Sequence, residues 1–176
     1  YIPFIEYFII PYLLWFVFIA VVMLYFFFTD VDGFYKLAKI MFTGMTIFLI
    51  ISTIFPNGQD LRPMVFERDN IFVDMVRMVY RMDTCTNVFP SLHVFNSVCA
   101  CIAIHESKAL KKHRTVCQAA YLLAGLIILA TMFLKQHSVL DVMAASFMAY
   151  VLYQFVYAKE RRRAPKLVKL PVVQNK

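Results

Sequence analysis

The stretch PYLLWFVFIAVVMLYFFF, which runs from Pro11 to Phe28, decides the fold of this protein. It contains no charged residue, and a helix built from it would be apolar on every face. About 20 such residues are needed to cross roughly 30 Å of hydrocarbon. A surface helix of a soluble domain would instead have one polar face. The sequence therefore predicts a transmembrane helix at this point.

Four further segments have the same character. They are Leu37–Phe55, Pro90–Ile104, Val116–Leu134 and Val139–Tyr157. Their charges lie near the segment ends, where Lys39 can extend its side chain towards water. The whole chain is 61% hydrophobic with a mean hydropathy of +0.67, well above the roughly 45–50% apolar content of soluble domains. We therefore expect an all-α, polytopic transmembrane helical bundle with five spans.

The net charge of +7 is concentrated in two places. One is the loop Glu106–Arg114, and the other is the tail that follows Tyr157. The positive-inside rule places both in the cytoplasm, and both do lie on one side of a five-span arrangement. The long loop Asn57–Phe89 then faces outward, together with the short loop Lys135–Ser138. Because the charge follows membrane topology, it does not indicate a nucleic-acid partner; the expected surroundings are a lipid bilayer.

The outward loop contains a further helical pattern over Asp69–Met82. Apolar side chains recur on one face, and charged side chains lie mostly opposite. The apolar positions are Ile71, Phe72, Met75, Met78, Val79 and Met82. Two interpretations remain open: a helix lying in the plane of the membrane interface, or a loop helix packed against the spans.

The four cysteines are Cys85, Cys99, Cys101 and Cys117. They show no spacing typical of a zinc site or a redox pair. Three lie within or at the edge of predicted spans, where cysteine behaves as a small apolar packing residue. We expect packing from them and no bound metal or other cofactor.

His137 and Asp141 lie four residues apart at the start of the last span, so their side chains can share one helix face. The aspartate can accept a proton from one imidazole nitrogen, which directs the other nitrogen outward as a base or nucleophile. An aspartate at the end of a span is costly without a partner. The alternative is a buried hydrogen bond that only ties two helices together.

The segment Pro90-Ser91-Leu92-His93 opens the third span. Proline is favoured in the first turn of a helix, and the free N–H groups there form an anion site. Ser91 adds a hydroxyl donor and His93 adds a titratable group. The alternative is an ordinary helix start with a chance histidine beside the membrane.

Two cations complete the set on the predicted outer face. Arg62 follows the second span and Lys135 precedes His137. Cations attract phosphate and would oppose a metal held by His93, His137 and Asp141. Alternatively, each cation only contacts lipid headgroups. His105 and His113 lie on the cytoplasmic side and are expected to be solvated.

These motifs together resemble the type 2 phosphatidic acid phosphatase superfamily of membrane lipid phosphatases. The resemblance rests on Arg62-Pro63, then Pro90-Ser91-x-His93, then His137-x-x-x-Asp141, in this order and on one side of the membrane. It implies that His137 is the nucleophile, Asp141 its orienting carboxylate and His93 the acid that protonates the leaving alcohol. It also implies that Arg62 and Ser91 hold phosphate.

Three positions depart from the family pattern. Phe55 stands where the family usually has a lysine, Leu92 where it has a glycine and Thr131 where it has an arginine. Lys135 could replace the missing arginine and hold phosphate. The departures are similar to those of sphingolipid headgroup transferases such as inositol phosphorylceramide synthases.

The expected function is hydrolysis of a phospholipid or polyprenyl phosphate without a metal. A headgroup transferase and a catalytically inactive lipid-binding protein remain alternatives. We expect residues 1–157 to form a transmembrane catalytic domain and residues 158–176 a basic cytoplasmic tail. Because the chain begins at Tyr1 and an even number of spans would place both ends inside, we expect a sixth span upstream. Compact size and short loops favour a bacterial cytoplasmic membrane.

Overall fold

The computed structural model describes residues 2–158, and in this part of the chain it contains six α-helices and no strand. They are α1 (Ile9–Thr29), α2 (Val31–Ile54), α3 (Ile71–Met82), α4 (Leu92–Glu106), α5 (Arg114–Phe133) and α6 (Val139–Tyr153). Short helical turns precede α1 (Glu6–Phe8), precede α5 (Leu110–Lys112) and extend α6 (Gln154–Ala158). The predicted tail lies outside the described residues.

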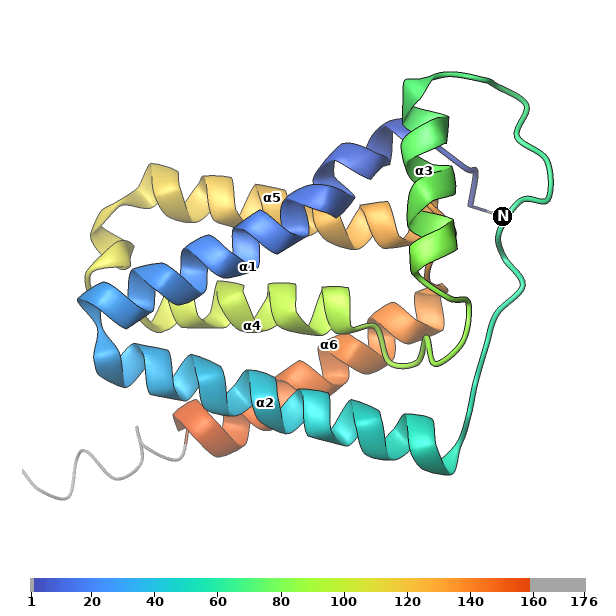
Figure 1. Ribbon diagram of the computed structural model, residues 1–176. Coiled ribbons are helices and arrows are strands. Elements are labelled where there is room, and N and C mark those ends of the chain that lie inside the picture. Colours follow the sequence, from blue (N-terminus) through green and yellow to red (C-terminus); the bar gives the residue numbers. More distant parts are fainter. Residues whose placement is uncertain (1, 159–176) are drawn as a thin grey trace, which may run out of the picture.

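Five helices run side by side, and α3 lies across one end of them (Figure 1). Four stretches are long and apolar enough to cross a membrane: Glu6–Thr29, Val31–Ile54, Arg114–Phe133 and Val139–Tyr157. The predicted all-α bundle is confirmed, and these helices indicate an integral membrane protein. The remaining predicted span, α4, has 15 residues and measures only about 22 Å at 1.5 Å per residue.

Helix α4 occupies the centre of the bundle, where it contacts α1, α2, α5 and α6. Small side chains such as Cys99, Ala100 and Ala103 are almost fully buried on it and let the neighbouring helices approach. Phe95 packs over Gly44 of α2, so closely that a Cβ there would lie 2.1 Å from the ring. Close packing around a central helix therefore fixes where α4 begins.

A single residue separates α1 from α2. Asp30 lies between them and caps α2, because its carboxylate accepts a hydrogen bond of 2.9 Å from the Gly33 amide. At the other end of α2, the Asn57 side chain accepts hydrogen bonds from the amides of Val88 and Phe89. These bonds tie the end of α2 to the segment that leads into α4.

Helix α3 begins at Ile71, and the side chain of the preceding Asn70 caps it. Val73 and Val76 are buried against the start of α1, which confirms that this helix packs on the spans. Ile71, Met78 and Met82 remain exposed on another side. The structure thus supports packing against the spans, and an orientation in the membrane interface stays a prediction.

The cysteines are all free thiols. Cys99 and Cys117 are buried, Cys101 is half-buried and Cys85 is exposed. The first three lie in the packed bundle, in agreement with their predicted role as packing residues.

Candidate active site

The starts of α4 and α6 meet at the end of the bundle on which α3 lies. The Ser91 amide donates a hydrogen bond of 3.4 Å to the Asp141 carbonyl, which ties the two helix starts together. Ser91 is fully buried and caps α4, its hydroxyl accepting a bond of 3.4 Å from the Val94 amide. Two of the three motifs are thus held in one place by backbone contacts.

His137 and Asp141 face each other with 3.7 Å between Nδ1 and Oδ2. Their side chains are only 10% and 8% exposed. The gap is too long for a hydrogen bond, and His137 Nδ1 is buried with no partner. A shift of about 0.8 Å would bring the two atoms to bonding distance.

Asp141 also holds the helix on which it lies. Its Oδ2 accepts a bond of 2.7 Å from the Ser138 amide, and its own amide donates to the Ser138 hydroxyl. This reciprocal capping box at the start of α6 fixes the carboxylate on the side of His137.

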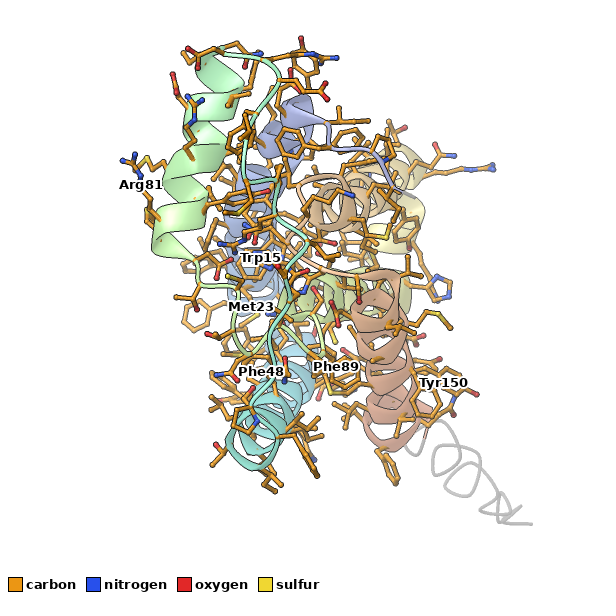
Figure 2. All side chains as sticks on the ribbon, turned by 90° about the vertical axis from the view of Figure 1, so that its right-hand side faces the viewer. Trp15, Met23, Phe48, Arg81, Phe89 and Tyr150 are labelled. Atoms are coloured by element: carbon orange, nitrogen blue, oxygen red, sulfur yellow. The ribbon has the colours of Figure 1, made fainter. Side chains whose placement is uncertain are left out.

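His93 lies between two aromatic rings of α1. The ring centroids of Tyr12 and Trp15 lie 4.7 and 4.4 Å from its imidazole. The imidazoles of His93 and His137 have centroids 6.0 Å apart. Figure 2, viewed from the α3 end, shows Trp15 towards the middle of the bundle. The structure therefore brings both predicted histidines together and adds two aromatic neighbours.

Arg62 reaches the same region from the long loop. Its guanidinium donates to the Gln136 side chain at 2.6 Å and to the carbonyls of Tyr80 and Asp83 at 3.1 and 2.8 Å. It also lies over the Tyr80 ring, 4.4 Å from the centroid. Its Nε is buried without a partner. Arg62 is thus anchored next to the residue that precedes His137.

Lys135 differs from Arg62 in direction. Its ammonium group donates to the Ile2 carbonyl, and its backbone adopts a positive φ of 55° in the tight turn between α5 and α6. The turn carries His137 next to His93, whereas the Lys135 side chain points towards the start of the chain. Thr131, at the position of the family's arginine, is fully buried.

Sequence reasoning missed several polar neighbours of the site. Gln59 donates to the carbonyls of Lys135 and Gln136, and Tyr12 donates to the Asp83 carboxylate at 3.2 Å. Gln59 and Gln136 lie next to predicted motifs in the sequence, and this adjacency could have identified them as neighbours of the site. Tyr12 gave no signal because it lies within an apolar stretch.

Tyr80 supports the arginine from α3. Burial raises the pKa of its hydroxyl to about 12, so the group stays protonated and donates to the Leu134 carbonyl at 2.6 Å. The bond links α3 to the end of α5, and the ring supports the Arg62 guanidinium.

A cavity of about 110 Å³ opens between these elements. Its lining consists of Phe48, Asp83, Thr84, Thr86, Asn87, Val88, Pro90, Leu92, His93, Gln136 and His137. Within residues 2–158, no three His, Cys, Asp or Glu side chains are grouped to hold a metal ion. The cavity thus offers two imidazoles, polar loop groups and apolar side chains from α2 and α4.

The comparison with protein families decides the identity of this arrangement. The model of the PAP2 superfamily matches residues 59–165, well over half of the chain. The chain belongs to the PAP2 superfamily. No match was found among curated proteins or solved structures.

The match to the PAP2 superfamily includes every predicted site residue, from Arg62 to Asp141. It indicates an enzyme of the phosphatase or phosphotransferase class. Helix α1, which supplies Tyr12 and Trp15, lies outside the matched region. The aromatic neighbours of His93 therefore come from a part of the chain that the family match does not cover.

Proposed function

We propose that the protein hydrolyses a lipid phosphate or a polyprenyl diphosphate through a phosphohistidine intermediate on His137. The observation that carries this proposal is the shared cavity of His93 and His137, with Asp141 directed at Nδ1 of His137. One imidazole is thereby oriented by a carboxylate, and the other is available for proton transfer. This division of tasks is what covalent phosphoryl transfer requires.

In the first step, His137 attacks phosphorus through Nε2, because Nδ1 faces Asp141. The N–P bond forms while the bond from phosphorus to the leaving oxygen breaks. His93, in its protonated form, gives a proton to that oxygen, and the lipid alcohol departs. The 6.0 Å between ring centroids leaves no room for a phosphoryl group between the rings. The group would therefore bind in the cavity that both rings line.

In the second step, neutral His93 takes a proton from water. The water oxygen bonds to phosphorus, the N–P bond breaks and inorganic phosphate leaves. His93 is protonated again, so the cycle closes without a net proton change on the enzyme. Two displacements with a covalent intermediate replace one difficult displacement.

The negative charge of the phosphoryl oxygens has to be neutralised without a metal in this mechanism. Arg62 supplies a guanidinium whose Nε is buried and unpaired, and the start of α4 with Ser91 supplies backbone donors. Such fixed donors stabilise spread negative charge strongly in a water-poor site. Lys135 would take part only after releasing the Ile2 carbonyl.

The surroundings of the cavity support a lipid substrate. Phe48 and Leu92 line it beside the polar groups, and it lies at the end of helices suited to cross a membrane. The phosphate can meet water there while the hydrocarbon tail stays in lipid. The charge distribution favours the outward face of the membrane for this site, and compact size and short loops favour a bacterial cytoplasmic membrane.

The test measures phosphate release in detergent from phosphatidic acid and from undecaprenyl diphosphate, with excess chelator. Wild type should release phosphate, and His137→Ala should release none. With phosphate-labelled substrate, wild type should also carry acid-labile, base-stable label. Loss of activity in chelator, or full activity of the variant, would contradict the mechanism.

A headgroup transferase is the second candidate, favoured by the departures at Phe55, Leu92 and Thr131. A lipid alcohol would then replace water in the second step. Adding ceramide or diacylglycerol to the assay with labelled phosphate distinguishes the two. A transferase moves the label to the added alcohol and releases little inorganic phosphate, whereas a hydrolase releases the label as inorganic phosphate. Binding of the lipid with no turnover under either condition would indicate an inactive, lipid-binding member.

A further inference from the structure

A second, larger cavity lies on a different side of α4. It has a volume of about 560 Å³, within the roughly 300–1,000 Å³ typical of ligand pockets. Cys101 of α4, Ala124 and Gly125 of α5, and Ser146 and Tyr150 of α6 line it. A Cβ added at Gly125 would meet no atom within 4 Å. Small side chains therefore keep a groove open between three helices.

This groove is separate from the candidate active site. The two cavities share no lining residue, and buried Val94, Ser97 and Ala145 lie along α4 and α6 between them. The lining of the groove is mostly apolar along α5 and α6, and Figure 2 shows Tyr150 at the edge of the bundle on α6. A hydrocarbon chain fits such a lining, but the phosphate that reacts at His137 lies at the opposite end.

The end of the groove away from the active site is polar. His105 and Glu106 line it there, and the Tyr153 hydroxyl donates to the Glu106 carboxylate at 3.4 Å. Groove residues Tyr121 and Gly125 continue a stripe on α5 that begins with Arg114 and Gln118, at spacings of four, three and four residues. Arg114 and Gln118 are both exposed. The stripe thus leads from the apolar groove to the basic loop.

We propose that this groove binds an anionic phospholipid of the leaflet on the basic side of the membrane. One acyl chain lies between α4, α5 and α6, and the phosphate lies at the positively charged loop beside Arg114. Clusters of Lys and Arg next to inter-helix pockets favour anionic headgroups, and Lys111 and Lys112 adjoin Arg114 in the sequence. This proposal does not depend on the catalytic mechanism.

The test measures thermal unfolding of the detergent-purified protein by circular dichroism. Phosphatidylglycerol and phosphatidylcholine with identical acyl chains are added at equal mole fraction. A ligand that binds the folded state raises the melting temperature. Phosphatidylglycerol should raise it by at least about 2 °C more than phosphatidylcholine does. Equal shifts for the two lipids would overturn the proposal.

Variants locate the site. Gly125→Leu fills the groove from α5 and should remove the difference between the two lipids. Ala119→Leu adds the same side chain on an exposed face of the same helix and should keep the difference. Arg114→Gln should reduce the phosphatidylglycerol shift. A preserved difference in Gly125→Leu would show that the lipid binds elsewhere and would overturn the proposal.

Two safeguards keep the test decisive. If Gly125→Leu does not fold, Ser146→Leu fills the groove from α6 and should give the same result. Native mass spectrometry of the wild type should also show a phosphatidylglycerol adduct that survives detergent removal, and absence of the adduct contradicts the proposal. If a protein segment fills the groove instead, neither lipid shifts the melting temperature. None of these measurements uses phosphate release, so their outcome does not depend on whether the proposed reaction is correct.

Discussion

At the scale of single residues, the Asp141 carboxylate makes two contacts that serve different purposes. Its Oδ2 accepts the Ser138 amide at 2.7 Å and faces His137 Nδ1 at 3.7 Å. The first contact holds a helix start, and the second would orient the proposed nucleophile once the distance closes. Catalytic hydrogen bonds are often long before substrate binds. The two tasks can be separated experimentally because only the second needs a negative charge.

Asp141→Asn should lower kcat by about 10²–10⁴-fold and change the melting temperature little. The amide oxygen still accepts the Ser138 amide but no longer stabilises an imidazolium or fixes its tautomer. Phosphate release and thermal unfolding are measured on the same preparation.

Ser138→Ala is the matched control for that variant. It removes the hydroxyl cap and should cost about 1 kcal/mol of the free energy of unfolding, with kcat within a few-fold of wild type. The opposite pattern, with an active Asp141→Asn and an inactive Ser138→Ala, would leave Asp141 a structural role only.

Two contacts of Tyr12 can also be separated, since its ring packs against His93 while its hydroxyl donates to Asp83. Tyr12→Phe keeps the ring and should hold kcat within about 5-fold, whereas Tyr12→Leu should lower kcat about 10- to 100-fold with a smaller change in KM. Equal kcat values for both variants and the wild type would show that the ring does not position His93.

The residues of the site were predictable to different degrees. His93, His137 and Asp141 could be found because titratable groups at span ends are costly and few, and the structure brings them together. Tyr12 and Trp15 could not, because an aromatic residue in an apolar span has the same appearance whether it faces lipid or a histidine. Lys135 has a backbone φ of 55°, and the direction of its side chain depends on that conformation. Because the residue is not a glycine, the sequence does not signal this conformation.

At the scale of elements, the contact between α2 and α4 is the most sensitive to substitution. Gly44→Ala should lower the free energy of unfolding by about 1–3 kcal/mol, because the new methyl group would overlap the Phe95 ring. Gly125→Ala should leave stability unchanged or raise it by up to about 1 kcal/mol, since its surroundings are open.

Thermal unfolding in detergent checks both glycine variants. The double variant Gly44→Ala with Phe95→Leu should recover part of the loss if the overlap is the cause. Similar stability for the two single alanine variants would mean that α2 and α4 pack less closely than described.

The exposed side of α3 gives a further prediction. In a Cys85→Ser background, a polarity-sensitive dye attached at Met78→Cys should be quenched by lipid nitroxides in nanodiscs more strongly than at Arg81→Cys. Met78 lies on the exposed apolar side, and Figure 2 shows Arg81 pointing away from the bundle. Equal quenching at the two positions would exclude an orientation in which the Met78 side of α3 meets the membrane.

Elements were predicted well where apolar runs are long. The boundaries of α1, α5 and α6 follow the hydrophobic segments because lipid selects for them along their whole length. Helix α2 begins at Val31, six residues before the predicted start at Leu37, because the Asp30 side chain caps it there. The central position of α4 was not predictable, since its burial results from four neighbouring helices. The sequence pattern of α3 left two orientations open because an apolar stripe can face protein or lipid equally well.

At the scale of the whole molecule, the expected topology places the active-site end outside and the basic loop inside. Exposed Cys85 should react with a membrane-impermeant maleimide in intact cells. Lys111→Cys in a Cys85→Ser background should react only after permeabilisation. The reverse labelling pattern would place the active site in the cytoplasm.

The short length of α4 has a consequence for which lipids can react. The helix covers about 22 Å and begins short of the level that α2 reaches (Figure 1), so His93 is recessed from the surface of the bundle. A terminal phosphate can reach that depth without carrying another polar group with it. A phosphodiester would have to carry its choline, glycerol or sugar down with it, losing the water around that group. The proposed phosphatase would thus favour terminal phosphates over phosphodiesters according to how far each must descend.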